Sequence, residues 1–179
     1  MEPINRREAI KRTAAVLGFT LSGSLISAVM SGCRTDTATG WRPAVLTPSQ
    51  LRTAADFAEV ILPRTETPGA KDAKVERFID SLADGYLSPE ETNLLLQFLD
   101  RLDEEGFADL SFEEQNSFTK QLLETEEGRA TFRSFKSMVM LGFFTSEVGA
   151  TQVLQYNEIP GIYSGCEPLE DVGGKTWAL

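Results

Sequence analysis

The amino-acid sequence predicts an all-α, single-domain helical bundle that is followed by an extended C-terminal tail. Three observations lead to this prediction. Helix-start motifs of one kind occur three times in the middle of the chain, and the apolar residues after each motif recur at helical spacing. No segment alternates apolar and polar residues convincingly enough to predict a strand. After Gln155, glycine, proline and aromatic residues are too frequent for a long helix.

The first residues resemble an export signal. Two arginines, Arg6 and Arg7, precede an uncharged and mildly apolar stretch over residues 14–30. This order is typical of a twin-arginine signal. The stretch is too short and too rich in small polar residues for a permanent membrane-spanning helix. A buried helix of the folded domain is the weaker interpretation, because four basic residues precede the stretch. We therefore expect export through the twin-arginine translocation machinery.

A cysteine follows the apolar stretch. Small residues, Ser31 and Gly32, stand directly before Cys33, as they do where a lipoprotein is cut and its cysteine is acylated. We therefore predict a signal peptide over residues 1–32, a lipid on Cys33 that anchors the protein to a membrane of the periplasm or cell envelope, and a flexible tether over residues 33–45. The folded domain with its tail then covers residues 46–179.

The first helix of the domain is predicted to begin after Thr47. Thr47 has the role of the N-cap, Pro48 suits the first helical position, and Gln50 completes a capping box. Apolar residues continue at helical spacing until Pro63, which ends the helix. After a turn, a second helix is predicted over residues 75–86, with its apolar residues on one face.

Two more capping boxes predict the next two helices. Ser88 pairs with Glu91 in the first box, and Ser111 pairs with Glu114 in the second. A last long helix is predicted over residues 130–144, and its phenylalanines and methionines suggest that it is largely buried.

The last part of the domain changes character. Residues 145–154 have room for one short helix, and the residues that follow predict an extended aromatic tail. Two interpretations of the tail stay open. It packs on its own bundle, or it crosses onto a partner protein, where tyrosine and tryptophan are favoured contact residues.

Composition excludes several classes of function. The chain has 17 Lys and Arg against 27 Asp and Glu, a net charge of −10, and removal of residues 1–32 leaves 13 against 25, about −12. This charge argues against nucleic acid and against electrostatic binding to anionic lipid. The chain contains no histidine, which excludes histidine-based acid–base catalysis and histidine-ligated metals. It also has no glycine-rich nucleotide-binding motif. We expect no cofactor and no metal in this chain.

The second cysteine has no expected partner within the chain. Because Cys33 is predicted to be acylated, Cys166 is left unpaired. An odd thiol in an exported protein suggests either burial or pairing with another chain, and we favour burial.

Several short motifs resemble a known family. They are LTPSQ at 46–50, ILPR at 61–64, TPGA at 67–70, GFFTSEVGATQVLQY at 142–156, IPG at 159–161 and YSGC at 163–166. Together they resemble the gluconate 2-dehydrogenase subunit 3 family over most of residues 46–168. The run from Gly142 is the most specific, and it departs from the family pattern at Phe143, where the family has tyrosine, and at Val148, where the family has proline.

The resemblance implies a small, non-catalytic subunit of a membrane-associated dehydrogenase. In the family, the large subunit is an FAD-containing flavoprotein of the glucose–methanol–choline type that oxidises a sugar, a sugar acid or another alcohol. A cytochrome c subunit with haem c often takes the electrons onward. The small subunit carries the export signal and supports export and maturation of the folded large subunit. The alternative is a stand-alone, lipid-anchored helical module that binds another envelope protein. An independent enzyme is the weakest interpretation, because nothing clusters its carboxylates, tyrosines or Cys166 in sequence.

We place the partner interface in the C-terminal run. Its residues are Phe144, Glu147, Gln152, Tyr156, Tyr163 and Cys166. Glu147 is expected to bond nearby backbone amides or to cap the short helix rather than to act as a functional carboxylate. A disulfide from Cys166 to the large subunit is a further hypothesis. The acidic clusters at 103–105 and 124–127 are interpreted as solvated helix ends.

Overall fold

The computed structural model describes residues 41–159, 161, 166–171 and 173–178. The chain divides into two units, Met1–Trp41 and Arg42–Leu179, and the fold described below belongs to the second. The predicted export signal, with Arg6, Arg7 and Cys33, lies outside the described residues. In the part of the chain that the structure describes, no helix is both long enough and apolar enough to cross a membrane.

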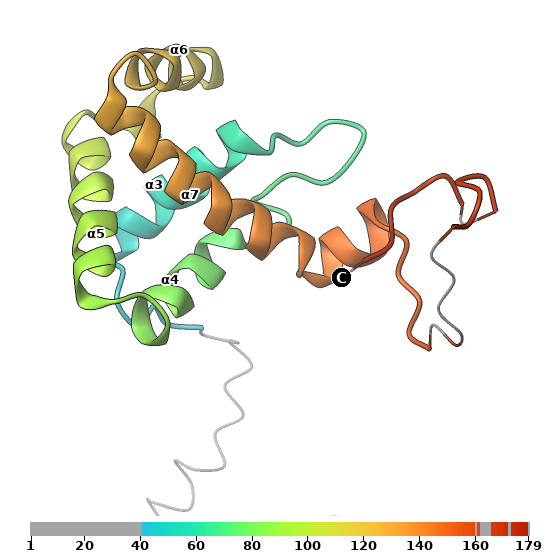
Figure 1. Ribbon diagram of the computed structural model, residues 1–179. Helices are drawn as coiled ribbons and strands as arrows, with labels where there is room; N and C mark the ends of the chain where they lie inside the picture. Colours follow the sequence, from blue (N-terminus) through green and yellow to red (C-terminus); the bar gives the residue numbers. More distant parts are fainter. Residues whose placement is uncertain (1–40, 160, 162–165, 172, 179) are drawn as a thin grey trace, which may run out of the picture. The chain divides into compact units, whose positions relative to one another are not determined.

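The second unit is built from helices, as the sequence predicts (Figure 1). In chain order they are α3 (Pro48–Ile61), α4 (Val75–Gly85), α5 (Pro89–Glu104), the 3₁₀ turn η1 (Phe107–Asp109), α6 (Phe112–Leu122), α7 (Glu126–Phe144) and the π-helical turn η2 (Gly149–Val153). Among the described residues, the only β-type pairing is an isolated bridge between Gln155 and Trp177. The all-α, single-domain fold class is confirmed.

All three predicted capping boxes are formed, at the starts of α3, α5 and α6. In each box the N-cap hydroxyl oxygen accepts a backbone N–H from the third helical residue, whose own side chain accepts the backbone N–H of the N-cap residue. At α5, Ser88 Oγ accepts the N–H of Glu91 at 3.2 Å, and Glu91 Oε2 accepts the N–H of Ser88 at 2.8 Å. These bonds satisfy N–H groups that the first helical turn leaves without partners, so the helix starts are fixed locally.

The start of α7 differs from the prediction, because the helix begins at Glu126 and not near residue 130. Thr125 caps it, and its Oγ1 accepts the N–H of Gly128 at 3.0 Å. Position 128, in the first turn of the helix, requires glycine. A Cβ there would lie 1.9 Å from the carbonyl oxygen of Leu122 and would collide with it. The glycine therefore marks a close packing contact rather than a linker.

The prediction that this helix is largely buried is also wrong. Only one stripe of α7 lies in the interior. Its residues are Gly128, Phe135, Val139, Gly142 and Phe143. The side chain of Leu141 is 52% exposed, and the residues at 129, 130, 133 and 134 are exposed as well. The helix is thus amphipathic, with one face in the core and the opposite face open to solvent.

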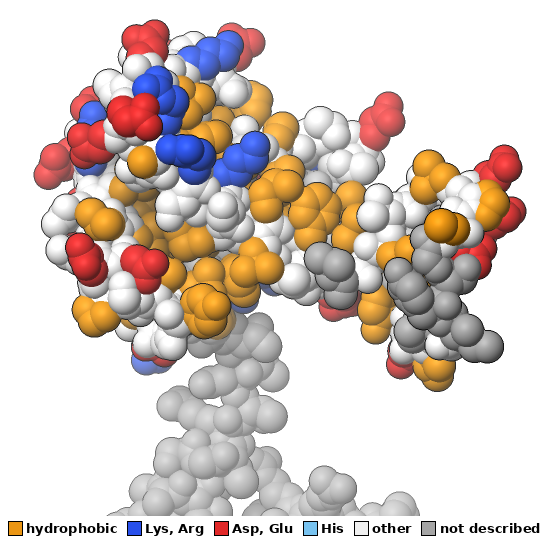
Figure 2. All heavy atoms as spheres, in the orientation of Figure 1, with side chains coloured by type: hydrophobic (Ala, Val, Ile, Leu, Met, Phe, Trp, Pro, Cys, Tyr) orange, Lys and Arg blue, Asp and Glu red, His pale blue; other side chains and the backbone are white. Residues whose placement is uncertain are grey.

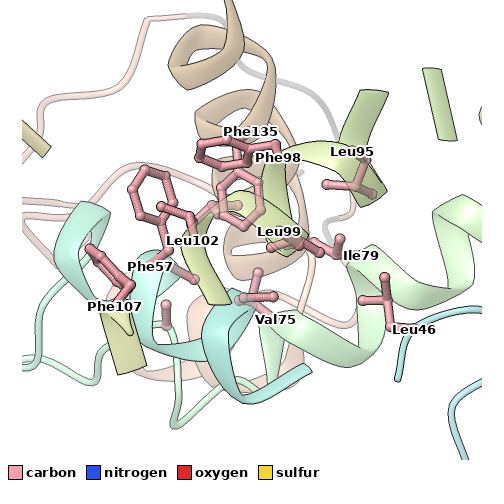
Figure 3. Close-up of a cluster of buried hydrophobic side chains, with 14 of the residues drawn as sticks. Leu46, Phe57, Val75, Ile79, Leu95, Phe98, Leu99, Leu102, Phe107 and Phe135 are labelled. Atoms are coloured by element: carbon pink, nitrogen blue, oxygen red, sulfur yellow. The ribbon is translucent and has the colours of Figure 1, made fainter. Parts of the chain in front are cut away.

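Helix α3 lies at the centre of the domain and packs against α4, α5, α6 and α7. Its small residues Ala54 and Ala58 are fully buried, which lets neighbouring helices approach closely. Phe57 forms edge-to-face contacts with Phe98 at 5.2 Å and with Phe135 at 5.1 Å between ring centroids (Figure 3). Such contacts add to the hydrophobic stabilisation from burial. Aromatic rings from α3, α5 and α7 therefore hold the centre of the core together.

A buried carboxylate fixes the point where the chain enters the domain. Asp80 lies on α4, is 1% exposed and accepts three backbone N–H groups. The donors are Ala44 at 2.7 Å, Val45 at 3.0 Å and Leu46 at 2.7 Å. The three bonds compensate the cost of burying the charged group. They also hold residues 44–46 against α4, although the sequence predicts that the first two of these residues belong to a flexible tether.

Candidate functional site

The predicted interface residues begin where α7 ends. Phe144 is the last residue of α7; it is half-buried, packs against the core and contacts Phe143 at 5.2 Å between ring centroids. Glu147, Gln152 and Tyr156 are exposed in the residues that follow. The structure therefore places Phe144 at the edge of the bundle and the other three on the surface. Tyr163 lies outside the described residues.

The turn after α7 is stabilised by Ser146 and not by Glu147. Ser146 Oγ donates to the carbonyl oxygen of Phe143 at 2.6 Å and accepts the N–H of Gly149 at 3.0 Å. Within the described residues the Glu147 carboxylate forms no hydrogen bond, and only its backbone carbonyl accepts one, from Thr151 Oγ1 at 2.6 Å. The expected capping role of the Glu147 side chain is therefore wrong. Glu147 is exposed, so its carboxylate is accessible from solvent.

The tail closes on itself beyond α7 (Figure 1). The N–H of Gln155 donates to the carbonyl oxygen of Thr176 at 2.8 Å, and the N–H of Ala178 donates to the carbonyl oxygen of Gln155 at 2.8 Å. Lys175 Nζ adds a bond to the carbonyl oxygen of Gln152 at 2.8 Å. These contacts join the two ends of the tail, so the residues between them form a loop whose base is fixed.

Apolar side chains of this loop are exposed. They are Tyr156, Ile159, Leu169 and Trp177, with exposed fractions between 43% and 81%. Figure 2 shows hydrophobic side chains at the tail, separate from those of the bundle. Val153 of η2, just before the tail, packs against the core, whereas these four side chains of the tail are exposed. A group of exposed apolar side chains is characteristic of a surface that binds another molecule.

Cys166 is a free thiol and is exposed. The favoured prediction, that this cysteine is buried, is therefore wrong. It lies in the exposed tail, where no surrounding core excludes solvent from the sulfur. The second interpretation, pairing with another chain, stays a prediction.

A groove runs between α5 and α7, and the sequence did not predict it. It has a volume of about 690 Å³. Its floor is formed by Leu95, Phe98, Leu122 and Phe135, which are buried residues of the core. At its edge, Leu94 of α5 is 60% exposed. Figure 2 shows hydrophobic side chains gathered along the trough between the two helices. The core of the domain therefore lies directly beneath the groove.

The edge of the groove is polar. Glu91 and Arg101 lie on the α5 side, and Glu127, Thr131 and Ser134 lie on the α7 side. The pKa of Glu91 is lowered by the hydrogen bond from the Ser88 hydroxyl and, second, by the bond from the Ser88 N–H. Glu91 therefore carries its negative charge well below neutral pH. An apolar floor with a polar edge is the usual anatomy of a protein–protein interface.

The acidic clusters predicted to be solvated helix ends are on α5 and around the start of α7. Among the described residues, no group of three or more acidic, cysteine or histidine side chains could hold a metal ion. Two members of the acidic clusters have partners of their own. Asp103 accepts a hydrogen bond from Thr53, and Glu126 pairs with Arg129 at 2.7 Å. These residues join helices or stabilise helix ends rather than face a common ligand.

The fold and these surfaces define a small all-α protein whose exposed apolar side chains include those of a loop-like tail, and whose helices α5 and α7 border a groove. The sequence model of the family described as Gluconate 2-dehydrogenase subunit 3 matches residues 48–161. The chain belongs to this family, as its sequence motifs predicted. The family is that of a subunit of a dehydrogenase complex, so its members act with other subunits. No curated protein and no solved structure matches the chain.

Proposed function

We propose that this chain is the small, non-catalytic subunit of a flavin-dependent dehydrogenase complex. Its large subunit is an FAD-containing flavoprotein of the glucose–methanol–choline type that oxidises a sugar, a sugar acid or another alcohol, and a cytochrome subunit with haem c is a candidate acceptor of the electrons. The family supports a role in an oxidoreductase complex. The observation that carries the proposal further is the exposed apolar loop of the tail, which suits a subunit that binds a larger partner.

The proposed role is export and maturation of the large subunit. The twin-arginine route moves folded proteins, so a folded flavoprotein without its own signal can cross the membrane when bound to a chain that has one. Arg6 and Arg7 would direct the pair to the translocation machinery, and the lipid on Cys33 would then hold the complex at the membrane in the periplasm. The complex is preassembled through the tail in this scheme, with Tyr156 and Glu147 among its contacts.

Affinity purification of the native lipoprotein from membranes tests the partner. We expect a flavoprotein in stoichiometric amount, detected by mass spectrometry and by the absorbance of bound flavin. The variant Tyr156→Ala should reduce the recovered flavoprotein, whereas Asn116→Ala, a change of a polar residue on α6 away from the tail, should not. A colourless protein without a large partner would instead favour the stand-alone binding module.

Cell fractionation tests the export role. In cells that make the variant Arg6→Lys/Arg7→Lys, we expect the large subunit to stay in the cytoplasm together with the small one. In cells that make Cys33→Ser, both should reach the periplasm but leave the membrane fraction. A large subunit that is exported normally in the arginine variant would contradict the escort role while leaving the family assignment intact.

A further inference from the structure

We propose that the loop between α3 and α4 is a second contact surface for the large subunit, and that Glu59 holds this loop in the conformation that binds. The loop covers residues 62–74, between the end of α3 at Ile61 and the start of α4 at Val75. The inference rests on the proposed function for the identity of the partner. It adds a contact on the helical domain itself, separate from the tail.

The loop is long for a connection between two helices that pack against each other. Helices of a bundle are usually joined by roughly two to eight residues. None of residues 62–74 belongs to a helix or a strand, and residues 63–67 are all exposed. Loops of about 12 residues or more without secondary structure are uncommon, and they are usually either functional or disordered. The contacts of the loop decide between these two explanations.

Glu59 fixes the loop from the last turn of α3. Its Oε1 accepts the N–H of Arg64 at 2.8 Å, and its Oε2 accepts the N–H of Lys71 at 2.9 Å. The base of the loop is closed by the N–H of Ala70, which donates to the carbonyl oxygen of Leu62 at 2.9 Å. One carboxylate thus ties both halves of the loop to the helix with charge-assisted hydrogen bonds, so the loop is ordered.

Gly69 shows how closely the loop is fitted around this carboxylate. A Cβ at this position would lie 2.4 Å from Glu59 Oε1 and 2.6 Å from the backbone nitrogen of Arg64, so a larger residue would displace the backbone. The N–H of Gly69 donates to Asp72 Oδ2 at 2.9 Å, and Asp72 Oδ1 pairs with the Arg64 guanidinium at 3.1 Å. A loop that is ordered before binding loses little conformational freedom on binding, which favours affinity.

The loop leaves the bundle near the place where the tail begins. It runs directly into the first turn of α4, where Phe78 lies against Gly142 in the last turn of α7. Figure 1 shows the loop and the tail on the same side of the bundle. A stable interface usually covers about 800 Å² of each protein. A large partner that binds the tail is therefore expected to cover the neighbouring loop as well.

The charges at the tip of the loop indicate what the partner presents to it. Arg64 is already paired with Asp72. Glu66 is exposed, and it forms no salt bridge with any residue that the structure describes. A lysine or arginine of the large subunit opposite Glu66 would complement this charge and would orient the two proteins.

Site-specific photocrosslinking in the intact complex tests the contact. A photoreactive phenylalanine analogue replaces Thr65 at the tip of the loop, and in a matched variant it replaces Ser117, an exposed residue of α6. We expect crosslinks from position 65 to one segment of the large subunit that contains lysine or arginine. Position 117 should give no crosslink to that segment.

Two substitutions test the role of Glu59 and the charge at the tip. Glu59→Ala removes the acceptor of both N–H groups, so amide exchange at Arg64 and Lys71 should become faster and the affinity for the purified large subunit should fall about ten-fold. Glu66→Lys keeps these hydrogen bonds, so it should weaken binding at low salt without faster exchange. Glu113→Lys, in the first turn of α6, is the matched control and should bind as the wild type does. Circular dichroism confirms that each variant is folded.

The outcomes distinguish this inference from the proposed function. No crosslink from position 65 in a complex that forms normally, or crosslinks only to a second copy of this chain, would overturn the loop proposal and leave the proposed function standing. Unchanged affinity in a folded Glu59→Ala variant with faster exchange would show that the order of the loop does not serve binding. If the wild-type chain forms no complex with the flavoprotein, both proposals fail together.

Discussion

At the scale of single residues, the most consequential polar group is Asp80. It accepts three backbone N–H groups from residues 34 to 36 positions earlier, and it is almost fully buried. We predict that Asp80→Ala lowers the free energy of unfolding by about 3 kcal/mol, because three buried N–H groups lose their acceptor. Urea denaturation of the purified chain measures the change. Asp84→Ala is the control, as Asp84 is exposed on the same helix, and equal losses in both variants would contradict the prediction.

A second prediction concerns a glycine within α7. A Cβ at Gly142 would lie 2.6 Å from Phe78 Cδ1 and 3.3 Å from Phe78 Cβ, where α7 packs on α4. The higher helix propensity of alanine would by itself stabilise the helix by about 1 kcal/mol. The collision outweighs this gain, since overpacking costs about 1–3 kcal/mol. We therefore predict a lower melting temperature for Gly142→Ala.

The control for this prediction is Gly85→Ala at the end of α4. A Cβ at Gly85 meets no atom within 4 Å, so this variant should be neutral or slightly stabilising. A second variant separates collision from other causes. In the background of Phe78→Leu, Gly142→Ala should cost less than in the wild type, because the smaller side chain leaves room. Independent, additive effects of the two substitutions would show that Phe78 is not the obstacle.

At the scale of helices, the capping boxes predict a dependence of stability on pH. The pKa values of Glu91 and Glu114 are lowered from 4.5 by hydrogen bonds from Ser88 and Ser111, first from the hydroxyl and then from the backbone N–H. A lowered pKa in the folded state means that the stabilisation is complete above the unfolded pKa and is lost as the pH falls through the folded pKa. The contribution is therefore lost as the pH falls below the ordinary glutamate pKa of 4.5.

The variant Glu91→Gln/Glu114→Gln tests this dependence. The glutamine oxygen accepts the same bonds as the carboxylate but does not titrate in this range, so both boxes persist at low pH. We predict that the free energy of unfolding falls less steeply with decreasing pH in this variant than in the wild type. Glu113→Gln, an exposed first-turn residue outside the box, controls for loss of a charge. A slope identical to that of the wild type would mean that the boxes do not contribute.

Individual helices also show which features of the fold were accessible from the sequence. The starts of α3, α5 and α6 were predictable because each box involves residues only three positions apart. The start of α7 was not, because Gly128 is explained by its contact with the preceding segment and not by its neighbours' propensity. For the same reason, the partners of Asp80 and the groove between α5 and α7 could not be predicted. They depend on how distant segments are brought together in the folded domain.

At the scale of the whole molecule, the sequence likewise predicted some features of the candidate site and missed others. The family motifs led to a predicted partner interface in the C-terminal run, and the structure shows that its members Gln152 and Tyr156 are exposed. That they bind a partner stays a prediction. The sequence did not show that Phe144 serves partly as core, that Ser146 rather than Glu147 stabilises the turn, or that Cys166 is exposed. These properties depend on where the last helix ends relative to the bundle. Local sequence does not contain that information.

The separation of core and tail leads to the last prediction. The contacts that close the tail lie almost entirely within residues 152–178, whereas the core is formed by helices α3 to α7 and the residues packed on them. A chain truncated after Leu154 should therefore keep its free energy of unfolding within about 0.5 kcal/mol, as substitutions away from core and caps do. Phe144→Ala should instead cost about 2 kcal/mol, because Phe144 packs against the core. Urea titration of both variants measures these values.

Binding should respond in the opposite order. Truncation removes the exposed apolar side chains of Tyr156, Ile159, Leu169 and Trp177, so it should abolish most of the affinity for the large subunit while the domain stays folded. Phe144→Ala should reduce binding only as far as it unfolds the end of α7. A truncated chain that unfolds, with a loss above about 2 kcal/mol, would assign the tail to the fold instead of the interface. A truncated chain that stays folded and binds normally would show that the partner binds to the helical domain and not to the tail.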